Sequence, residues 1–156
     1  MIEIKTIIVP IDFSDVSSLI AKWAKEVAKK FDAKIILVHV IEDISTFEGM
    51  SPGAKTLHEL EKTLIEGAQE YMQIFLSKYF SDFNQVKPII AKGKIVEKII
   101  EIAKENSADL IIIGTHGRKG LDKIIFGSVA EGIVKYSPIP VLTINPYRIK
   151  ENNLTL

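Results

Sequence analysis

The residues best placed to do chemistry are three glycines and a serine near the middle of the second half of the chain. An apolar run at 110–113, rich in β-branched residues, stops at Gly114, which is typical of a buried parallel strand. After Ser128 the apolar residues follow the spacing of a helix. The pattern G-x2-G-x9-G-S is filled by Gly114, Gly117, Gly127 and Ser128.

This arrangement suits a phosphate. Glycine lets the backbone approach a ligand closely, and a helix start carries unpaired N–H groups and a partial positive charge. Gly127 and Ser128 are therefore predicted to offer amide donors and a hydroxyl to an anion. The glycines alone leave a structural alternative open, in which Gly114 and Gly117 make a tight turn and Ser128 caps the helix.

A second candidate is Asp12, which ends the first apolar run of the chain. A carboxylate at the end of a parallel strand can accept hydrogen bonds from ribose hydroxyls or from an adenine amine. The spacing equally allows Asp12 to cap the first helix or to anchor the loop before it.

Other chemistries find little support. His39, His58 and His116 show no H-x-x-x-H spacing, so no metal site is predicted from them. Neither G-x-x-x-x-G-K-[ST] nor G-x-G-x-x-G is present. No residue stands out as a general base for a water molecule, so no catalytic residue is assigned and binding with slow or no turnover is expected.

The elements that must position these residues alternate between strands and helices. A long helix carries one apolar stripe from Leu57 to Tyr79, and an irregular stretch at 42–56 is long enough to be a flap. Pro88 places its strand at a sheet edge or a bulge. Strands are predicted at 6–11, 34–41, 86–91, 110–113 and 140–144, and helices at 14–31, 57–79, 94–105 and from 128. Such alternation predicts an α/β fold with a doubly wound parallel sheet.

Composition sets further bounds. The 156 residues favour a single domain at 1–156, with a polar tail at about 147–156. The formal net charge is zero, so no nucleic acid and no membrane surface is expected to attract the chain. There is no cysteine, no apolar run of transmembrane length and no signal-peptide pattern, which favours a cytoplasmic protein.

The G-x2-G-x9-G-S pattern resembles the ATP-binding signature of the universal stress protein family. The stretches VPIDFS at 9–14 and SPIPVL at 137–142 agree, and the resemblance covers nearly the whole chain. It implies a Rossmann-like fold of the adenine nucleotide alpha hydrolase-like kind, with five parallel strands in the order 3-2-1-4-5. Asp12 and Gly114 would then flank one crevice at the point where the strand order reverses.

The resemblance also implies a nucleotide site. ATP would place its base and ribose near Pro10, Asp12, Ile113 and the backbone of Val40. Its phosphates would lie against Gly114, Thr115, His116, Gly117, Arg118, Gly127, Ser128 and Val129. Mg²⁺ or Mn²⁺ would bridge the phosphates with few protein ligands. For Lys119, a solvated turn and a phosphate contact remain equally open.

Finally, the resemblance implies a homodimer through the last strand, Val141 to Ile144. The alternative is that the tail covers this edge within one molecule. The family resemblance indicates a nucleotide-dependent regulatory module of the stress response, and leaves its protein partner unidentified. Two alternatives stay open: a slow ATPase or phosphotransferase, and a dimeric interaction module that binds no nucleotide.

Overall fold

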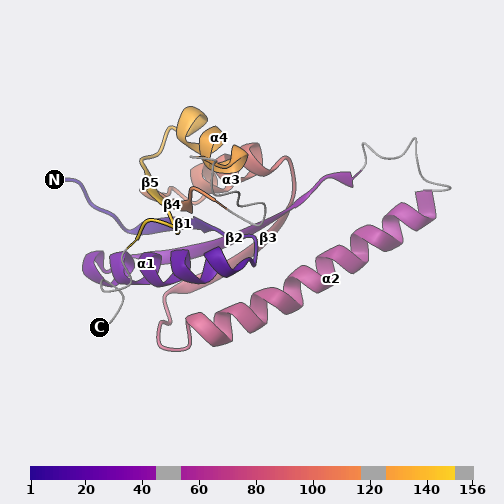
Figure 1. The fold of residues 1–156 in the computed structure, drawn as a ribbon, viewed down its shortest axis with the longest axis horizontal. Coiled ribbons are helices and arrows are strands. Elements are labelled where there is room, and N and C mark those ends of the chain that lie inside the picture. The colour runs from indigo at the N-terminus through magenta and orange to yellow at the C-terminus, as the bar shows by residue number, and fades with distance from the viewer. Residues whose placement is uncertain (45–53, 117–125, 150–156) are drawn as a thin grey trace.

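Five parallel strands form the centre of the fold, in the order β3-β2-β1-β4-β5. The computed structural model describes residues 1–44, 54–116 and 126–149. Its elements are β1 (Thr6–Pro10), α1 (Asp15–Phe31), β2 (Lys34–Glu42), α2 (Ala54–Tyr79), β3 (Val86–Gly93), α3 (Ile95–Glu105), β4 (Leu110–Gly114), α4 (Ser128–Tyr136) and β5 (Val141–Ile144) (Figure 1). The predicted α/β class and strand order are confirmed.

The helices cover the sheet from both sides. In Figure 1, α1 and α2 lie on one face and α3 and α4 on the other. Two apolar clusters match this division: one joins the sheet to Ile20, Ala24 and Met72, the other joins it to Ile99 and Ile133. Because both faces are buried, the central strands read as continuous apolar runs rather than as alternating ones.

The two strands that carry the predicted site are joined at their amino ends by a side chain. The Oδ2 atom of Asp109 accepts hydrogen bonds from the backbone amides of Lys5 at 2.8 Å and Thr6 at 2.9 Å. Ile7 then pairs with Leu110, and Ile8 with Ile111. This contact fixes how β1 and β4 lie beside each other, and so which residues meet at their carboxyl ends.

Strand β3 is a sheet edge, as Pro88 predicted. The amide of Ile35 donates to the carbonyl of Gln85, and Leu37 pairs with Pro88 in the same ladder. Donors alternate in direction along a parallel strand, so the amides of 87 and 89 face β2 and the ring nitrogen of Pro88 faces outward. The missing donor therefore costs no hydrogen bond within the sheet.

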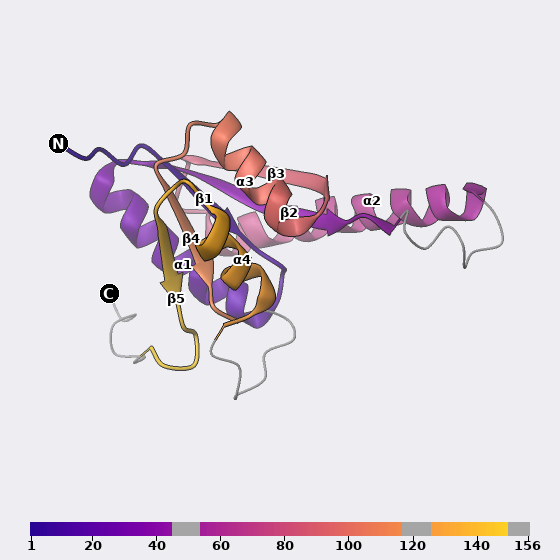
Figure 2. The ribbon, with the colours of Figure 1, turned by 90° about the horizontal axis from the view of Figure 1, so that it is seen from above.

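Helix α2 begins earlier than predicted. It starts at Ala54 rather than at Leu57, and β2 extends to Glu42, so the irregular stretch is shorter than 42–56. The rest of the predicted flap, 45–53, lies outside the described residues. Figure 2 shows α2 and the ends of β2 and β3 running past the other strands. There an ion pair joins the helix to the strand: Nζ of Lys92 in β3 lies 2.9 Å from Oε1 of Glu61 in α2.

Among the helices that the structure describes, none combines the length and the apolar character needed to cross a bilayer.

Candidate functional site

The predicted crevice lies where β1 and β4 end side by side. β1 and β4 are parallel neighbours, and the sheet continues from them to opposite sides: β2 lies next to β1, and β5 lies next to β4. In open α/β sheets such a switch point, at the carboxyl ends of the strands, is where ligands bind. Asp12 follows β1 and Gly114 ends β4, so the fold brings together the two residues that the sequence analysis placed at this crevice.

Asp12 is held by the start of α1. Its Oδ1 atom accepts hydrogen bonds from the Ser14 amide at 3.0 Å, the Ser14 hydroxyl at 2.5 Å and the Ser17 hydroxyl at 2.9 Å. The structural reading of Asp12 as a loop anchor is therefore correct. All three bonds converge on one oxygen, which fixes the orientation of the carboxylate at the crevice. Ser17, which is 4% exposed, and Ser14 were not among the predicted site residues.

Phe13 is a third residue of this region that was not among the predicted site residues. Its φ is 61°, in the left-handed region that a bulky side chain rarely adopts. Its ring lies 4.4 Å from the His39 ring and 5.8 Å from the Tyr71 ring, measured between centroids. The carbonyl of Ile11 accepts a hydrogen bond from Nδ1 of His39 at 2.9 Å. A backbone carbonyl thus satisfies one ring nitrogen of His39, and the same bond holds the loop after β1.

The two glycine regions are joined directly by backbone. The amide of Gly127 donates to the carbonyl of Thr115 at 2.6 Å. A Cβ on Gly127 would lie 3.1 Å from that carbonyl oxygen, so glycine permits the approach. The prediction that Gly127 offers its amide to an anion is therefore wrong, because that donor is used within the chain.

The donors at the start of α4 begin one residue later. Gly127 is the N-cap, with φ −68° and ψ 154°, and its carbonyl accepts the first helical bond, from Glu131 at 2.9 Å. Ser128 is thus the first helical residue, and the alternative in which it caps the helix is wrong. The amides of Ser128 and Val129 precede the first helical donor, which is where helices bind anions.

The end of β4 is buried against its neighbours. A Cβ on Gly114 would lie 3.1 Å from Ile20 Cδ1, so only glycine fits there without a shift. Thr115 and His116 are 4% and 7% exposed, and Thr115 Oγ1 lies 2.8 Å from His116 Nδ1. The His116 ring meets Tyr147 edge-on at 5.1 Å between centroids. Tyr147, which the sequence analysis assigned to the tail, therefore contacts a predicted site residue.

The apolar side of the predicted site is continuous. Val40, Ile113 and Val129 belong to one apolar cluster, although they come from β2, β4 and α4. Pro10 ends β1, and Ile11 donates its amide to the carbonyl of Val38 at 2.8 Å. Three predicted residues, Gly117, Arg118 and Lys119, lie outside the described part of the chain.

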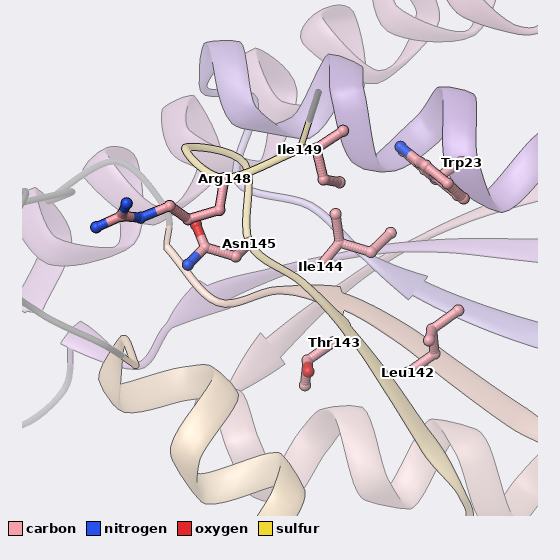
Figure 3. A pocket seen from close by; sticks show the side chains of 7 residues that line it. All are labelled: Trp23, Leu142, Thr143, Ile144, Asn145, Arg148 and Ile149. Atoms are coloured by element: carbon pink, nitrogen blue, oxygen red, sulfur yellow. The ribbon is translucent and has the colours of Figure 1, made fainter. Parts of the chain in front are cut away.

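A cavity of about 410 Å³ lies elsewhere, between α1 and the edge strand β5. It is lined by Trp23, Leu142, Thr143, Ile144, Asn145, Arg148 and Ile149 (Figure 3). Trp23 faces the apolar side chains, whereas Arg148 points away from it. The indole nitrogen of Trp23 is buried and, within the described structure, has no hydrogen-bond partner. This cavity borders the predicted dimer edge and is separate from the crevice.

The strand order defines a doubly wound α/β protein, with a candidate ligand site at its topological switch point. Within that class, the chain belongs to the universal stress protein family, whose model matches residues 3–145. It is 36% identical to universal stress protein MJ0531 of Methanocaldococcus jannaschii over 90% of this chain and 81% of that one.

Solved structures agree on the fold. The structure of protein MJ0577 from the same organism has a TM-score of 0.78 at 32% identity, covering 90% of this chain and 95% of that one. A universal stress protein of Archaeoglobus fulgidus in complex with dAMP has a TM-score of 0.63 at 22% identity, covering 93% and 100%.

Proposed function

We propose that this chain is an ATP-binding regulatory module of the stress response. The observation that carries the proposal is the switch point, where the oriented carboxylate of Asp12 follows β1 and the amides that open α4 are joined to the end of β4 through the bond from Gly127 to Thr115. The first can accept from ribose or adenine, and the second can donate to phosphate. The signature glycines and the dAMP complex of the Archaeoglobus relative support an adenine nucleotide as the ligand.

Each part of the nucleotide has candidate contacts. The base and ribose lie against Pro10, Asp12, Ile113 and the backbone of Val40. The phosphates lie against the end of β4 and the start of α4. That set comprises Gly114, Thr115, His116, Gly117, Arg118, Ser128 and Val129, with Gly127 acting through its close approach to Thr115 rather than as a donor.

A divalent cation, Mg²⁺ or Mn²⁺, completes the proposal. Within the described residues no three acidic, histidine or cysteine side chains gather into a cation site. The donors at this crevice fit a cation that is carried by the phosphates and keeps most of its waters. When bound, the cation would offset the charge of the triphosphate, while the protein supplies amides and Asp12.

We further propose that the module binds its nucleotide with little or no turnover. The described side chains near the crevice are engaged with one another: Asp12 with Ser14 and Ser17, and His116 with Thr115. A hydrolase would need a group that positions water for attack in line with the leaving phosphate. Steady phosphate release that Ser128→Ala abolishes would overturn this part of the proposal.

The proposal includes a single domain over 1–156, a cytoplasmic location and a homodimer through β5. Leu142 on this edge strand is 39% exposed and borders the cavity beside Trp23. An uncovered edge strand with apolar side chains offers both backbone and side-chain contacts to a second copy. Sedimentation of wild type and Leu142→Lys tests it, since the charge on the edge would lower dimer affinity.

The decisive experiment is calorimetric titration with ATP and Mg²⁺ of three variants. Asp12→Ala and Gly127→Val are expected to weaken binding strongly, the latter because its side chain would meet the Thr115 carbonyl. Asp15→Ala, on the exposed first turn of α1, is the matched control and should bind as wild type does. Thermal unfolding of each variant separates lost binding from lost folding. Unchanged affinity in both folded site variants would reject the assignment.

A further inference from the structure

Helix α2 carries two apolar stripes, and only one of them meets the sheet. The single stripe predicted from Leu57 to Tyr79 is divided in the structure. Ala68, Met72 and Phe75 are buried against the core. The second stripe lies beside the first on the helix surface, outside the buried core, and consists of Leu57, Leu60, Leu64, Gly67, Tyr71 and Ile74. Of these, Tyr71 also lies near the ring of Phe13, at 5.8 Å between centroids.

The second stripe is exposed along most of its length. Leu60 is 49% exposed, Leu64 40%, Tyr71 63% and Ile74 55%. Single exposed apolar residues are normal on a protein surface. Here the spacing alternates strictly between three and four residues over nearly five turns of one helix. That repeat is the pattern by which two helices pack along a seam.

Gly67 lies at the middle of the stripe and has no role in the fold that the structure shows. A Cβ placed on it would meet no atom within 4 Å. Glycine in a helix interior is unfavourable compared with alanine. Close approach of another helix would account for a glycine at this position, whereas contacts within the chain do not.

The stripe is complementary to itself when the second helix runs antiparallel. In the register that centres it between residues 65 and 66, Leu57 faces Ile74 of the other copy. Leu60 then faces Tyr71, and Leu64 faces Gly67. At the centre, the large side chain of Leu64 thus meets Gly67, which leaves room for it. Each of the other positions in the stripe faces an apolar side chain.

The flanking residues agree with this register. If the stripe occupies the a and d positions of a heptad, Thr63 faces Glu70 of the other copy, so no like charges oppose each other there. Glu61 and Ala68 flank the stripe on the side turned to their own chain, where Ala68 is 7% exposed. Glu61 is also held by Lys92 at 2.9 Å, so its charge is already paired within its own chain. We propose that the second stripe of α2 is an interface between two copies of this chain, related by a twofold axis near residues 65 and 66.

This interface is separate from the one proposed at β5. Helix α2 contacts β2 and β3, and β5 is the opposite edge of the sheet (Figures 1 and 2). Each contact would have its own twofold axis, so both together would make an assembly larger than a dimer. Six positions per copy are fewer than the roughly 20 to 30 residues a side of a standard interface, so we expect association that depends on concentration.

Sedimentation velocity over a range of protein concentrations tests the size of the assembly. Leu64→Glu places a charge beside the twofold axis and should shift association to at least tenfold higher concentration. Gln73→Glu adds the same charge to the same helix outside the stripe and should leave association unchanged. The proposal would be overturned if Leu64→Glu associated over the same concentration range as wild type, or if the two variants weakened association equally. Either outcome would hold whatever contact β5 makes.

Cross-linking tests the register. The natural chain has no cysteine, so single cysteines report only the intended contact. An equimolar mixture of Leu60→Cys and Tyr71→Cys chains should form a mixed disulfide dimer under mild oxidation. Each variant alone should not, because residues 60 and 60 of two antiparallel copies lie about 16 Å apart along the axis. Cross-linking of Leu60→Cys alone would indicate a parallel pair and overturn the register, and no cross-link in the mixture would overturn the interface.

Discussion

The ring of Phe13 rests on the imidazole of His39, with 4.4 Å between their centroids and 35° between their planes. Phe13 directly follows Asp12, and His39 in turn is bonded to the carbonyl of Ile11. The residues before and after Asp12 are therefore fixed by the same imidazole. Aromatic contact of this kind offsets part of the cost of the left-handed backbone at Phe13.

This contact gives a first prediction. Phe13→Ala should lower the free energy of unfolding by about 2 kcal/mol, because it removes the half-buried ring and keeps a side chain at positive φ. Phe13→Gly removes the same ring but suits the backbone, so it should be more stable than Phe13→Ala by about 1 kcal/mol. Urea denaturation measures both. Equal stability of the two variants would show that the backbone conformation at this position stores no strain.

Two helical glycines make a matched pair. A Cβ on Gly132 of α4 would lie 2.7 Å from Val96 Cγ2 of α3, whereas a Cβ on Gly67 would meet nothing within 4 Å. Gly132→Ala is expected to destabilise the protein by about 1–3 kcal/mol through overpacking. Gly67→Ala should stabilise it by about 1 kcal/mol through helix propensity. Denaturation at low protein concentration compares them, and a stabilising Gly132→Ala would mean that α3 and α4 separate easily.

Asp109 is expected to contribute more to the stability of the fold than its partial exposure indicates. Its carboxylate accepts from two backbone amides at the start of β1, at 2.8 and 2.9 Å. Asp109→Ala leaves both donors without this acceptor and should cost about 1–3 kcal/mol of folding free energy. Asp109→Asn keeps an oxygen in place and should cost less. Chemical denaturation orders the three proteins, and an order with Asp109→Asn as the least stable would contradict the geometry.

The pair between Lys25 and Asp82 predicts a dependence on pH. The hydrogen bond from Lys25, 2.6 Å long, holds the pKa of Asp82 below its ordinary value of 3.8. A lowered carboxylate pKa stabilises the fold above the unfolded pKa, and this contribution is lost as pH falls through the folded one. Because Asp82 is exposed, the effect is small. Wild type should exceed Asp82→Asn in stability at pH 7, and the difference should shrink as the pH falls below 3.8 and vanish once Asp82 is protonated in the folded protein. A constant difference would exclude this cause.

Removal of the cation separates phosphate contacts from base contacts in the proposed site. Chelation of Mg²⁺ should weaken ATP binding several-fold, since the triphosphate then brings its full charge to the crevice. Binding of dAMP should change little, because a single phosphate needs no bridging cation. Titrations of both nucleotides with and without chelator measure this. Equal sensitivity of the two nucleotides would place the cation on the protein instead.

Local patterns predicted the elements well and their partners less well. The apolar run before Gly114 and the helical spacing after Ser128 gave β4 and α4 directly, because burial on both faces of a sheet and on one face of a helix leaves a periodic trace. The order of the strands came from the family resemblance, since alternation alone allows several orders. The single stripe predicted for α2 was an error of the same kind. Apolar residues on a helix indicate that it packs against something, but they do not identify which surface each residue contacts.

The site shows the same limit at closer range. Asp12 and Gly114 lie at the ends of neighbouring strands, as the strand order implied by the resemblance required. The bond from Gly127 to Thr115 was not foreseen, because it joins two backbone groups whose sequence carries no donor or acceptor signal. Phe13 was missed for a related reason, since the sequence around a phenylalanine does not indicate that its backbone adopts the left-handed conformation. Such features arise from tertiary packing, which overrides local preference.

Pro88 has a consequence for growth by strand addition. Its nitrogen faces outward from β3, so that margin of the sheet lacks one donor that an incoming strand would require. The β5 margin contains no proline within Val141–Ile144. Addition of a further strand is thus favoured at β5 and hindered at β3, so growth of the sheet itself would stop once two chains had joined through β5, which discourages fibrils built from successive sheets.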